Sequence, residues 1–350
     1  MAKLHKNSFG FLRLFFAFLV IVSHTPELKD GNRSREILTS IFGSLSFGEV
    51  AVDGFFIISG YFIVTSFIRS SSISSYFIKR IFRIYPGYIA SFIFCLLIVG
   101  PLAGTPIAEL PRHVVRQIIN IPMLRAPILP HVFDGQPYPS LNGAMWSLSY
   151  EFSCYVIVVL LGLSGIFKRS SAVFLLIIFL ISFYILSQSH YAQLNTFFRL
   201  CMVFMCGAAW AVAPKLRAWS WTLFFISSTI SILFLFLGKY AEIGLSIFGS
   251  YSILSFGFLV NKGILTKINN KTDISYGVYL YAWPIEKLIF LYFPTISLIS
   301  AGTIDFLMSA LCAIASWHIV ERPMQKWSHK LSEQLSSRPL FKSPASPKLP

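Results

Sequence analysis

The stretch FGFLRLFFAFLVIVSHTP, residues 9–26, is an almost unbroken apolar run that contains one arginine and one histidine. A helix needs about 20 apolar residues to cross the hydrocarbon core of a bilayer. Lys3 and Lys6 precede the run, as basic residues do in a secretory signal peptide. No small-residue cleavage site follows, however, and Arg13 lies within the run. We therefore interpret residues 9–26 as a membrane-spanning helix.

Apolar runs of similar length recur along the chain. The ten expected spans are roughly residues 9–26, 46–68, 87–104, 146–166, 171–188, 195–213, 218–237, 242–260, 273–293 and 298–319. The chain is 55% hydrophobic and 12% charged, whereas a soluble domain carries about 25% charged residues. We expect an all-α integral membrane protein with about ten transmembrane helices. Residues 1–325 would form one transmembrane domain, and residues 326–350 a basic, disordered cytoplasmic tail.

The charges between the spans predict the orientation. With the N-terminus in the cytoplasm, nineteen Lys and Arg residues fall in cytoplasmic segments and seven in outer segments. The positive-inside rule therefore predicts that both termini are cytoplasmic. Nucleic-acid binding is not expected despite the net charge of +15, because no basic stripe alternates with exposed aromatic residues.

Ionisable side chains within spans are costly unless they are paired, so each one is a functional candidate. The set is Arg13, His24, Glu49, Asp53, Glu151, Arg199, Asp273, Glu286, Lys287 and Asp305. Near span ends, snorkelling toward water is the simpler explanation. It would account for Arg199, Glu286, Lys287 and Asp305.

Arg13 and His24 lie eleven residues apart in the first span. Eleven helical steps return to within about 20° of the same face and cover about 16 Å. Both side chains can therefore line one internal cavity without touching the same reacting atom. The arginine suits an anionic ligand, and the histidine suits proton transfer near neutral pH. The alternative is a topological anchor together with an interfacial histidine.

Acidic residues could support this pair. In GEVAVDGFFIISGY (48–61), Glu49 and Asp53 lie one turn apart, where they could orient His24 or an acceptor sugar. In WSLSYEFSCY (146–155), Ser147 and Glu151 open the fourth expected span. A carboxylate in that setting needs a partner, and we expect Arg13 or another arginine to supply it.

Basic residues gather on the predicted cytoplasmic side. YFIKRIFRIYPGY (76–88) places Lys79, Arg80 and Arg83 together before Pro86, which we expect to break the helical pattern. Such a cluster could hold phosphates or lipid headgroups. In VERP (320–323), an acid stands at the end of the last span, just before a proline expected to stop the helix.

Two long outer segments, residues 27–45 and 105–145, separate neighbouring spans. The second contains seven prolines. Long loops in compact proteins are often lids or binding loops. We expect these two segments to cover or bind a ligand on the outer side.

In sequence order, these motifs resemble those of acyltransferase family 3, a family of integral-membrane O-acyltransferases that modify bacterial surface glycans. The resemblance covers roughly residues 8–325. It rests on the Arg-to-His spacing of the first span and on FFIISGY, RIFRIYPGY, WSLSYE, ISYGVYLYAWP and VERP. It implies a donor, usually acetyl-CoA, that approaches from the cytoplasm, and an acyl group that ends on an outer hydroxyl. It also implies a multi-pass protein of the bacterial inner membrane.

The resemblance also implies roles for individual residues. The implied catalytic residues are Arg13, His24 and Glu151. The implied donor-binding residues are Arg80, Arg83 and Tyr88. Together with Glu321, which the resemblance implies, we expect Glu49, Asp53 and Ser147 to support the site. His24 would act as a general base or would briefly carry the acyl group.

The implied acceptor is a glycan or lipid-linked glycan, such as O-antigen or exopolysaccharide, with membrane lipids as surroundings. No group of residues suggests a metal. One departure from the family is Ala282, because many members have a histidine before the Trp-Pro of that motif. Two alternatives remain open: a transporter or flippase for a lipid-linked glycan, and a scaffold without catalysis.

Overall fold

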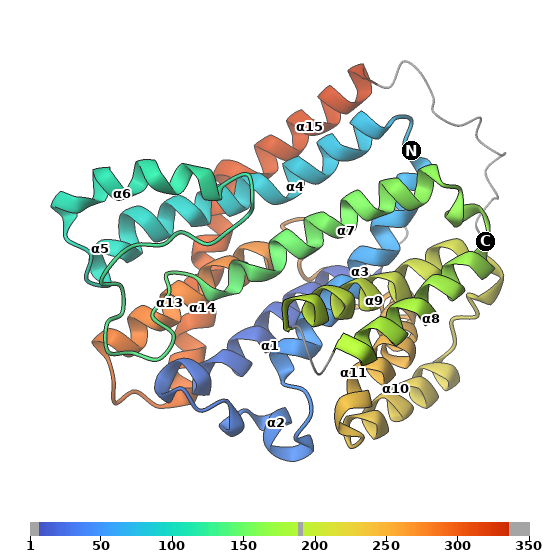
Figure 1. Cartoon of the computed structure of the whole chain (residues 1–350), viewed down its shortest axis with the longest axis horizontal. Coiled ribbons are helices and arrows are strands. Elements are labelled where there is room, and N and C mark those ends of the chain that lie inside the picture. The colour runs from blue at the N-terminus through green and yellow to red at the C-terminus, as the bar shows by residue number, and fades with distance from the viewer. Residues whose placement is uncertain (1–6, 188–191, 336–350) are drawn as a thin grey trace.

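The computed structural model describes residues 7–187 and 192–335. Within these residues every regular element is a helix (Figure 1). The α-helices are α1 (Phe9–Asp30), α2 (Ile37–Phe42), α3 (Phe47–Arg69), α4 (Ile73–Phe94), α5 (Gly100–Leu102), α6 (Leu110–Gln117), α7 (Trp146–Leu163), α8 (Ser170–Ser187), α9 (Ala192–Val212), α10 (Trp221–Leu235), α11 (Ala241–Gly244), α12 (Ser250–Leu259), α13 (Ser275–Tyr292), α14 (Leu298–Ser316) and α15 (Arg322–Gln334). The all-α prediction is confirmed.

Seven helical stretches of the described chain are long and apolar enough to cross a membrane. They are Phe9–Asp30, Phe47–Arg69, Ile73–Leu102, Gly143–Leu163, Leu194–Val212, Gly238–Leu259 and Leu298–Gln334. Two shorter apolar helices are α8 and α10, and α13 covers the remaining expected span. Helices suit this apolar sequence because a helix satisfies its own backbone hydrogen bonds in lipid. The count of ten spans and the cytoplasmic termini stay predictions.

Both prolines expected to interrupt helices lie within continuous helical stretches. Pro86 lies inside α4. A π-helical turn, Trp317–Glu321, joins α14 to α15, and Pro323 falls in the first turn of α15. In the π-helical turn the Arg322 N–H bonds the carbonyl of Trp317, five residues back, and this shifted hydrogen-bond pattern accommodates Pro323 without ending the helix. Consequently residues 326–334, expected to be disordered, are helical, and residues 336–350 lie outside the described residues.

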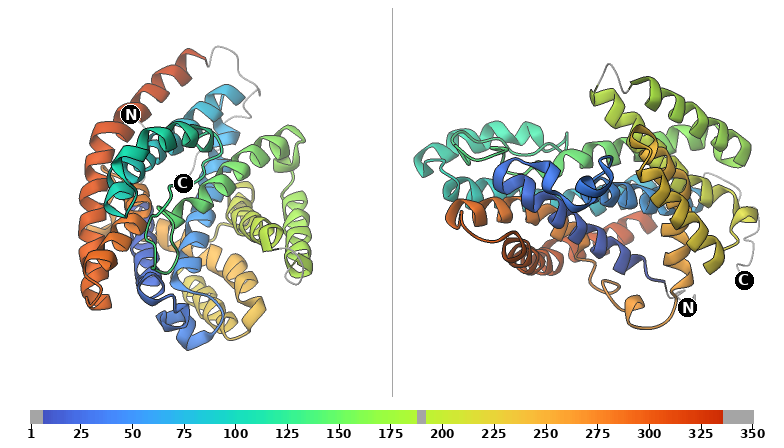
Figure 2. Two further views of the ribbon diagram at one scale, coloured as in Figure 1. Left: turned by 60° about the vertical axis from the view of Figure 1, so that its left-hand side comes forward. Right: turned by 90° about the horizontal axis from the view of Figure 1, so that it is seen from below.

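The helices form a bundle with α3 near its centre. α3 packs along α9, and α1 lies against α3, α13 and α14. Figures 1 and 2 show α8, α9 and α10 on one side of α3, with α4, α6 and α15 on the other. Residues from the central helices α1, α3, α9 and α13 surround the polar groups described below.

The contact between α3 and α9 depends on two glycines. A Cβ at Gly60 would lie 2.0 Å from the carbonyl oxygen of Phe204, and one at Gly207 would lie 2.1 Å from that of Ile57. Small residues allow helix backbones to approach closely in membranes, where packing replaces the hydrophobic effect as the source of association. These glycines therefore set the spacing between the two helices.

We predict that Gly60→Ala lowers the stability of the protein. The added methyl would meet backbone rather than a movable side chain, and overpacking of this kind costs about 1–3 kcal/mol. The measurement is the thermal unfolding midpoint of purified protein in detergent. Gly302→Ala is the control, because its Cβ would meet nothing closer than Thr25 Oγ1 at 3.3 Å. Equal thermal unfolding midpoints for Gly60→Ala and Gly302→Ala would show that the α3 and α9 backbones do not pack too closely for a methyl group at position 60.

Candidate active site

A cavity of about 820 Å³ surrounds His24. We call it the His24 cavity. Its walls come from α1, α3, α7, α8, α9, α11 and α13, together with loop residues that include Tyr138. Trp146, Tyr150 and Trp283 supply aromatic surface. The volume lies within the range of about 300–1,000 Å³ that small-molecule sites occupy.

The imidazole of His24 is oriented by its own helix. Its Nδ1 lies 3.3 Å from Glu27 Oε2, and its ring meets the ring of Trp283 edge-on with centroids 5.0 Å apart. A carboxylate only accepts hydrogen bonds, so Nδ1 carries the hydrogen and the lone pair is on Nε2. That arrangement leaves Nε2 available as a base. The expectation that Glu49 or Asp53 would orient His24 is wrong, because Glu27 does so.

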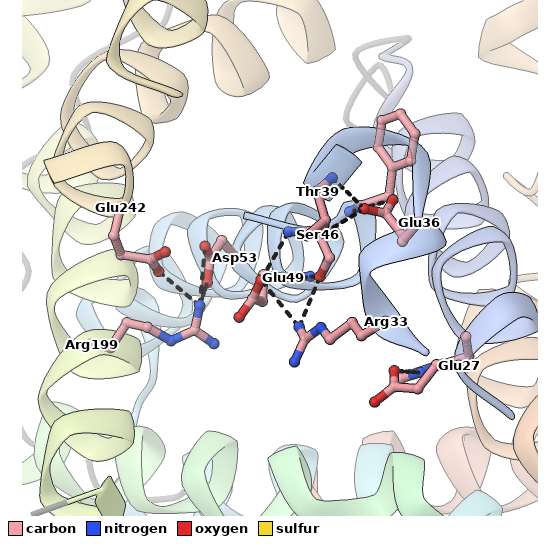
Figure 3. Close-up of polar contacts among 11 residues, drawn as sticks. Glu27, Arg33, Glu36, Thr39, Ser46, Glu49, Asp53, Arg199 and Glu242 are labelled. Carbon is pink, nitrogen blue, oxygen red and sulfur yellow. Dashed lines mark hydrogen bonds and ion pairs between the residues drawn. The ribbon is translucent and has the colours of Figure 1, made fainter. Parts of the chain in front are cut away.

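Glu49 instead caps the start of α3. It forms a capping box with Ser46, whose side chain accepts from the Glu49 amide while the Glu49 carboxylate accepts from the Ser46 amide. Arg33 Nη2 lies 3.1 Å from Glu49 Oε2 and 3.0 Å from Ser46 Oγ (Figure 3). Glu49 still lines the His24 cavity. Its charge, however, is matched by Arg33.

Asp53 belongs to a buried cluster of three charges. Arg199 Nη1 lies 3.2 Å from Asp53 Oδ1 and 2.8 Å from Glu242 Oε1 (Figure 3). Both carboxylates are buried, and the Arg199 side chain is 11% exposed. The cluster links α3, α9 and α11 beside the His24 cavity. Snorkelling, the simpler explanation for Arg199, is therefore wrong. It is equally wrong for Glu286, Lys287 and Asp305, which are buried.

The second long segment, residues 105–145, packs against α4 and α13. Lys287 Nζ donates to the carbonyl of Pro137 at 2.5 Å, and Trp283 Nε1 donates to that of Ser140 at 3.4 Å. These contacts hold the part of the loop that brings Tyr138 and Gly143 to the His24 cavity. Buried Lys287 thus fastens one wall of this cavity.

A second cavity, of about 140 Å³, lies beside Arg13. We call it the Arg13 cavity. Its polar lining consists of Arg13, Ser59, Arg80, Arg83, Ser147, Glu151, Tyr155, Ser275, Tyr276 and Tyr279. The prediction that Arg13 and His24 line one internal cavity is wrong, because each of them lines a cavity of its own.

Asp273 joins two of the arginines. Its Oδ2 lies 3.2 Å from Arg13 Nη2 and 2.9 Å from Arg83 Nη2. Asn269 and Ser275 donate to its other oxygen. The two guanidinium groups and these two hydrogen bonds all favour the charged form of this carboxylate. The carboxylate therefore stays ionised and fixes both guanidinium groups.

Two donors at the Arg13 cavity remain unused. The Nε atoms of Arg13 and Arg80 are buried without a hydrogen-bond partner. A buried unpaired donor costs free energy, and an anion would satisfy it. The residues present therefore fit an anionic ligand.

Glu151 has partners other than the arginine we expected. Its Oε1 accepts hydrogen bonds from Ser59 Oγ at 3.0 Å and from Tyr155 Oη at 2.5 Å. The prediction of an ion pair with Arg13 or another arginine is wrong. Ser147 hydrogen-bonds Tyr279 across 2.8 Å, so it supports the wall between the cavities.

Three predicted site residues line neither cavity: Asp53, which belongs to the charge cluster described above, Tyr88 and Glu321. Tyr88 is fully buried, and its hydroxyl donates to the carbonyl of Arg125 at 2.6 Å, so it anchors the loop 105–145 rather than a donor. Glu321 lies in the π-helical turn and accepts from Ser316 Oγ at 3.1 Å. Ala282 is buried in α13 and also lines neither cavity, so a histidine is not missing from either.

The two cavities adjoin one another. Of the described residues, Val52 of α3 and Tyr279 of α13 are the two that line both. No group of three or more His, Cys, Asp or Glu side chains in the described parts of the chain could hold a metal ion. Sequence reasoning missed Glu27, Tyr138 and Tyr279. Glu27 had a signal, since it follows His24 by three residues on one helix face.

We predict that Arg199→Met strongly destabilises the protein. The substitution leaves Asp53 and Glu242 buried without a cation, and breaking a buried pair costs about 3–5 kcal/mol. The matched control is Arg33→Met, because the half-exposed pair with Glu49 contributes only about 0–1 kcal/mol. Folded yield and thermal midpoint in detergent measure both effects. If the two variants were equally stable, the buried cluster would not be a structural constraint.

Comparison with known proteins places this geometry in a sequence family. Residues 6–320 match the family described as acyltransferase domain. An O-acetyl transferase of Shigella phage Sf6 is 30% identical over 94% of this chain and 99% of its own length. Nodulation protein 10 of Rhizobium leguminosarum bv. viciae is 33% identical over 48% of this chain and 47% of its own. Acyltransferase MdmB of Streptomyces mycarofaciens is 27% identical over 41% and 36%, respectively. No solved structure matches the chain.

Proposed function

Since the chain belongs to the family of acyltransferase domains, we propose that it moves an acetyl group from acetyl-CoA at the cytoplasmic face to a hydroxyl of a glycan at the outer face. The membrane would be the bacterial inner membrane. The O-acyltransferase activity itself follows from the family and from the O-acetyl transferase relative. The observation that carries the proposal is the pair of adjoining cavities, one with arginine donors and one with His24. A transporter or a scaffold is not retained, because the family is one of enzymes.

The donor fits the Arg13 cavity. Arg80 and Arg13 offer unpaired buried donors, which phosphate oxygens of CoA would satisfy. The basic cluster of α4 lies on the predicted cytoplasmic side, where CoA is found. From Arg13 to His24 the helix rises about 16 Å, a length comparable with a pantetheine arm. The thioester would therefore reach toward His24 while the nucleotide stays near the arginines.

The acceptor fits the His24 cavity. The charged pairs on its wall, such as Arg33 with Glu49, are matched among themselves, and aromatic rings supply much of the remaining surface. Such a lining suits a polar, uncharged ring with apolar faces, as a sugar has. The printed name of the phage relative supports acetyl as the transferred group.

His24 would act as the general base. The acceptor hydroxyl oxygen attacks the thioester carbonyl carbon, forming a C–O bond, while the C–S bond breaks. Nε2 of His24 takes the hydroxyl proton and returns it to the departing thiolate, so that free CoA thiol and an acetyl ester result. Glu27 holds the Nδ1–H and stabilises the imidazolium between these steps.

We predict that His24→Ala abolishes acetylation and that Glu27→Gln lowers the rate at least about tenfold, because the amide can favour the wrong tautomer. Mass spectrometry of surface glycans would compare cells with the intact protein, cells without the gene, and cells carrying each variant at equal protein level. The proposal is supported if glycans gain the mass of an acetyl group in cells with the intact protein, and do not gain it in cells that lack the gene or carry His24→Ala. Full acetylation with His24→Ala would refute His24 as the base.

The donor-binding assignment makes a separate prediction. Arg80→Met should weaken the binding of CoA by about tenfold, since a charge-assisted hydrogen bond contributes about 1.5–3 kcal/mol. Calorimetric titration of CoA into the protein in nanodiscs measures this. Lys79→Met is the matched control, because Lys79 precedes Arg80 on α4 but lines neither cavity. Equal affinities for the two variants would remove Arg80 from the donor site.

A further inference from the structure

The wall between the two cavities is thin and consists of particular side chains. Val52 and Tyr279 line both cavities, whereas Arg13 lines one and His24 the other. Both wall residues are buried, at 8% and 6% exposure. With the CoA phosphates beside the arginines, the pantetheine arm must therefore cross this wall at Val52 and Tyr279 to bring the acyl group at its tip to His24.

Tyr279 is held firmly in this wall. Its hydroxyl donates to the carbonyl of Ala144 at 2.6 Å. Because the hydroxyl has one hydrogen, Ser147 Oγ donates to it across 2.8 Å. Phe55 contacts the ring from the side of α3, with centroids 6.0 Å apart. Ala144, Ser147 and Phe55 therefore hold the ring of Tyr279 in one orientation.

Val52 is the residue that α3 supplies to this wall, and its side chain is short and stiff. A β-branched residue in a helix has one strongly preferred rotamer, so Val52 cannot swing aside as a longer side chain could. Its backbone is equally fixed, because α3 packs against α9 through the glycine contacts described above. The width at this point is therefore determined by the volume of the side chain.

We propose that Val52 and Tyr279 form the passage between the donor and acceptor cavities and that their bulk sets the length of the acyl group transferred. This inference rests on the proposed function. It assigns acyl-chain selectivity to two residues that do not bind the CoA phosphates or take the proton. The acyl group at the tip of the arm lies against Val52 and Tyr279 when its carbonyl reaches His24, so an acetyl group fits there whereas each added methylene meets the two side chains.

The test compares acyl donors of different length. Membranes containing the protein receive acetyl-CoA or butyryl-CoA, with surface polysaccharide from cells that lack the gene as acceptor, and mass spectrometry counts the added groups. Val52→Ala should raise the butyryl-to-acetyl ratio of kcat/KM at least about tenfold, since one methylene in an apolar site is discriminated by about 10–200-fold. Tyr279→Phe, which loses both hydroxyl contacts, should shift the ratio in the same direction.

Two further variants make the outcome decisive. Val64→Ala is the control, because Val64 is buried on the same helix and lines neither cavity, so the ratio should not change. Val52→Phe narrows the passage and should depress acetyl transfer while calorimetric CoA binding stays at the wild-type level. Suppose that the wild type transfers acetyl groups. An unchanged butyryl-to-acetyl ratio of kcat/KM in Val52→Ala, or full acetyl transfer by Val52→Phe, would then overturn the passage but not the proposed function. No transfer from either donor by wild type would overturn the proposed function and the passage together.

Discussion

One carboxylate held between two arginines fixes the geometry on which the site depends. Asp273 meets Arg13 of α1 and Arg83 of α4, and it lies itself just before α13. An unpaired charge within a bilayer is costly, so these three segments must come together for the bundle to form. Because Arg13 and His24 share one helix, the same contact also sets the level of His24, about 16 Å further along. The ion pairs of Asp273 therefore stabilise the bundle and also fix the position of His24.

The two cavities differ in how their polar groups are satisfied. Around His24 the cations Arg33 and Arg199 are paired with Glu49 and Glu242, and a buried atom left without a hydrogen bond there, Glu242 Oε2, is an acceptor. Beside Arg13, in contrast, buried guanidinium donors remain unused. The unpaired donors of the Arg13 cavity favour binding of an anion there. In the His24 cavity, where the cations already have partners, the shape and the aromatic surface select the ligand. The structure therefore separates recognition of charge from recognition of shape along a single path.

The sequence predicted helices at all ten apolar runs, because lipid leaves a chain of this composition few other folds. It also predicted that Arg13 and His24 face the same way, since helical periodicity is local. It failed where partners come from distant segments: Asp53 pairs with Arg199, 146 residues away. The prediction that Tyr88 binds the donor is not supported for a related reason. Tyr88 shares a motif with Arg80, but membership of one motif does not place two side chains on the same side of α4. Glu27 was within reach of sequence reasoning, being one turn from His24.

The unbroken course of α1 limits how this protein can change over evolutionary time. Inserting one residue between Arg13 and His24 would rotate the histidine by about 100° and raise it by about 1.5 Å. That rotation would turn the ring away from Trp283, which lies edge-on to it. Gene variants that lengthen or shorten this segment should therefore be eliminated, whereas single-residue replacements on its lipid-facing side should accumulate. We therefore expect the number of residues between Arg13 and His24 to be constrained more strongly than the identity of those residues.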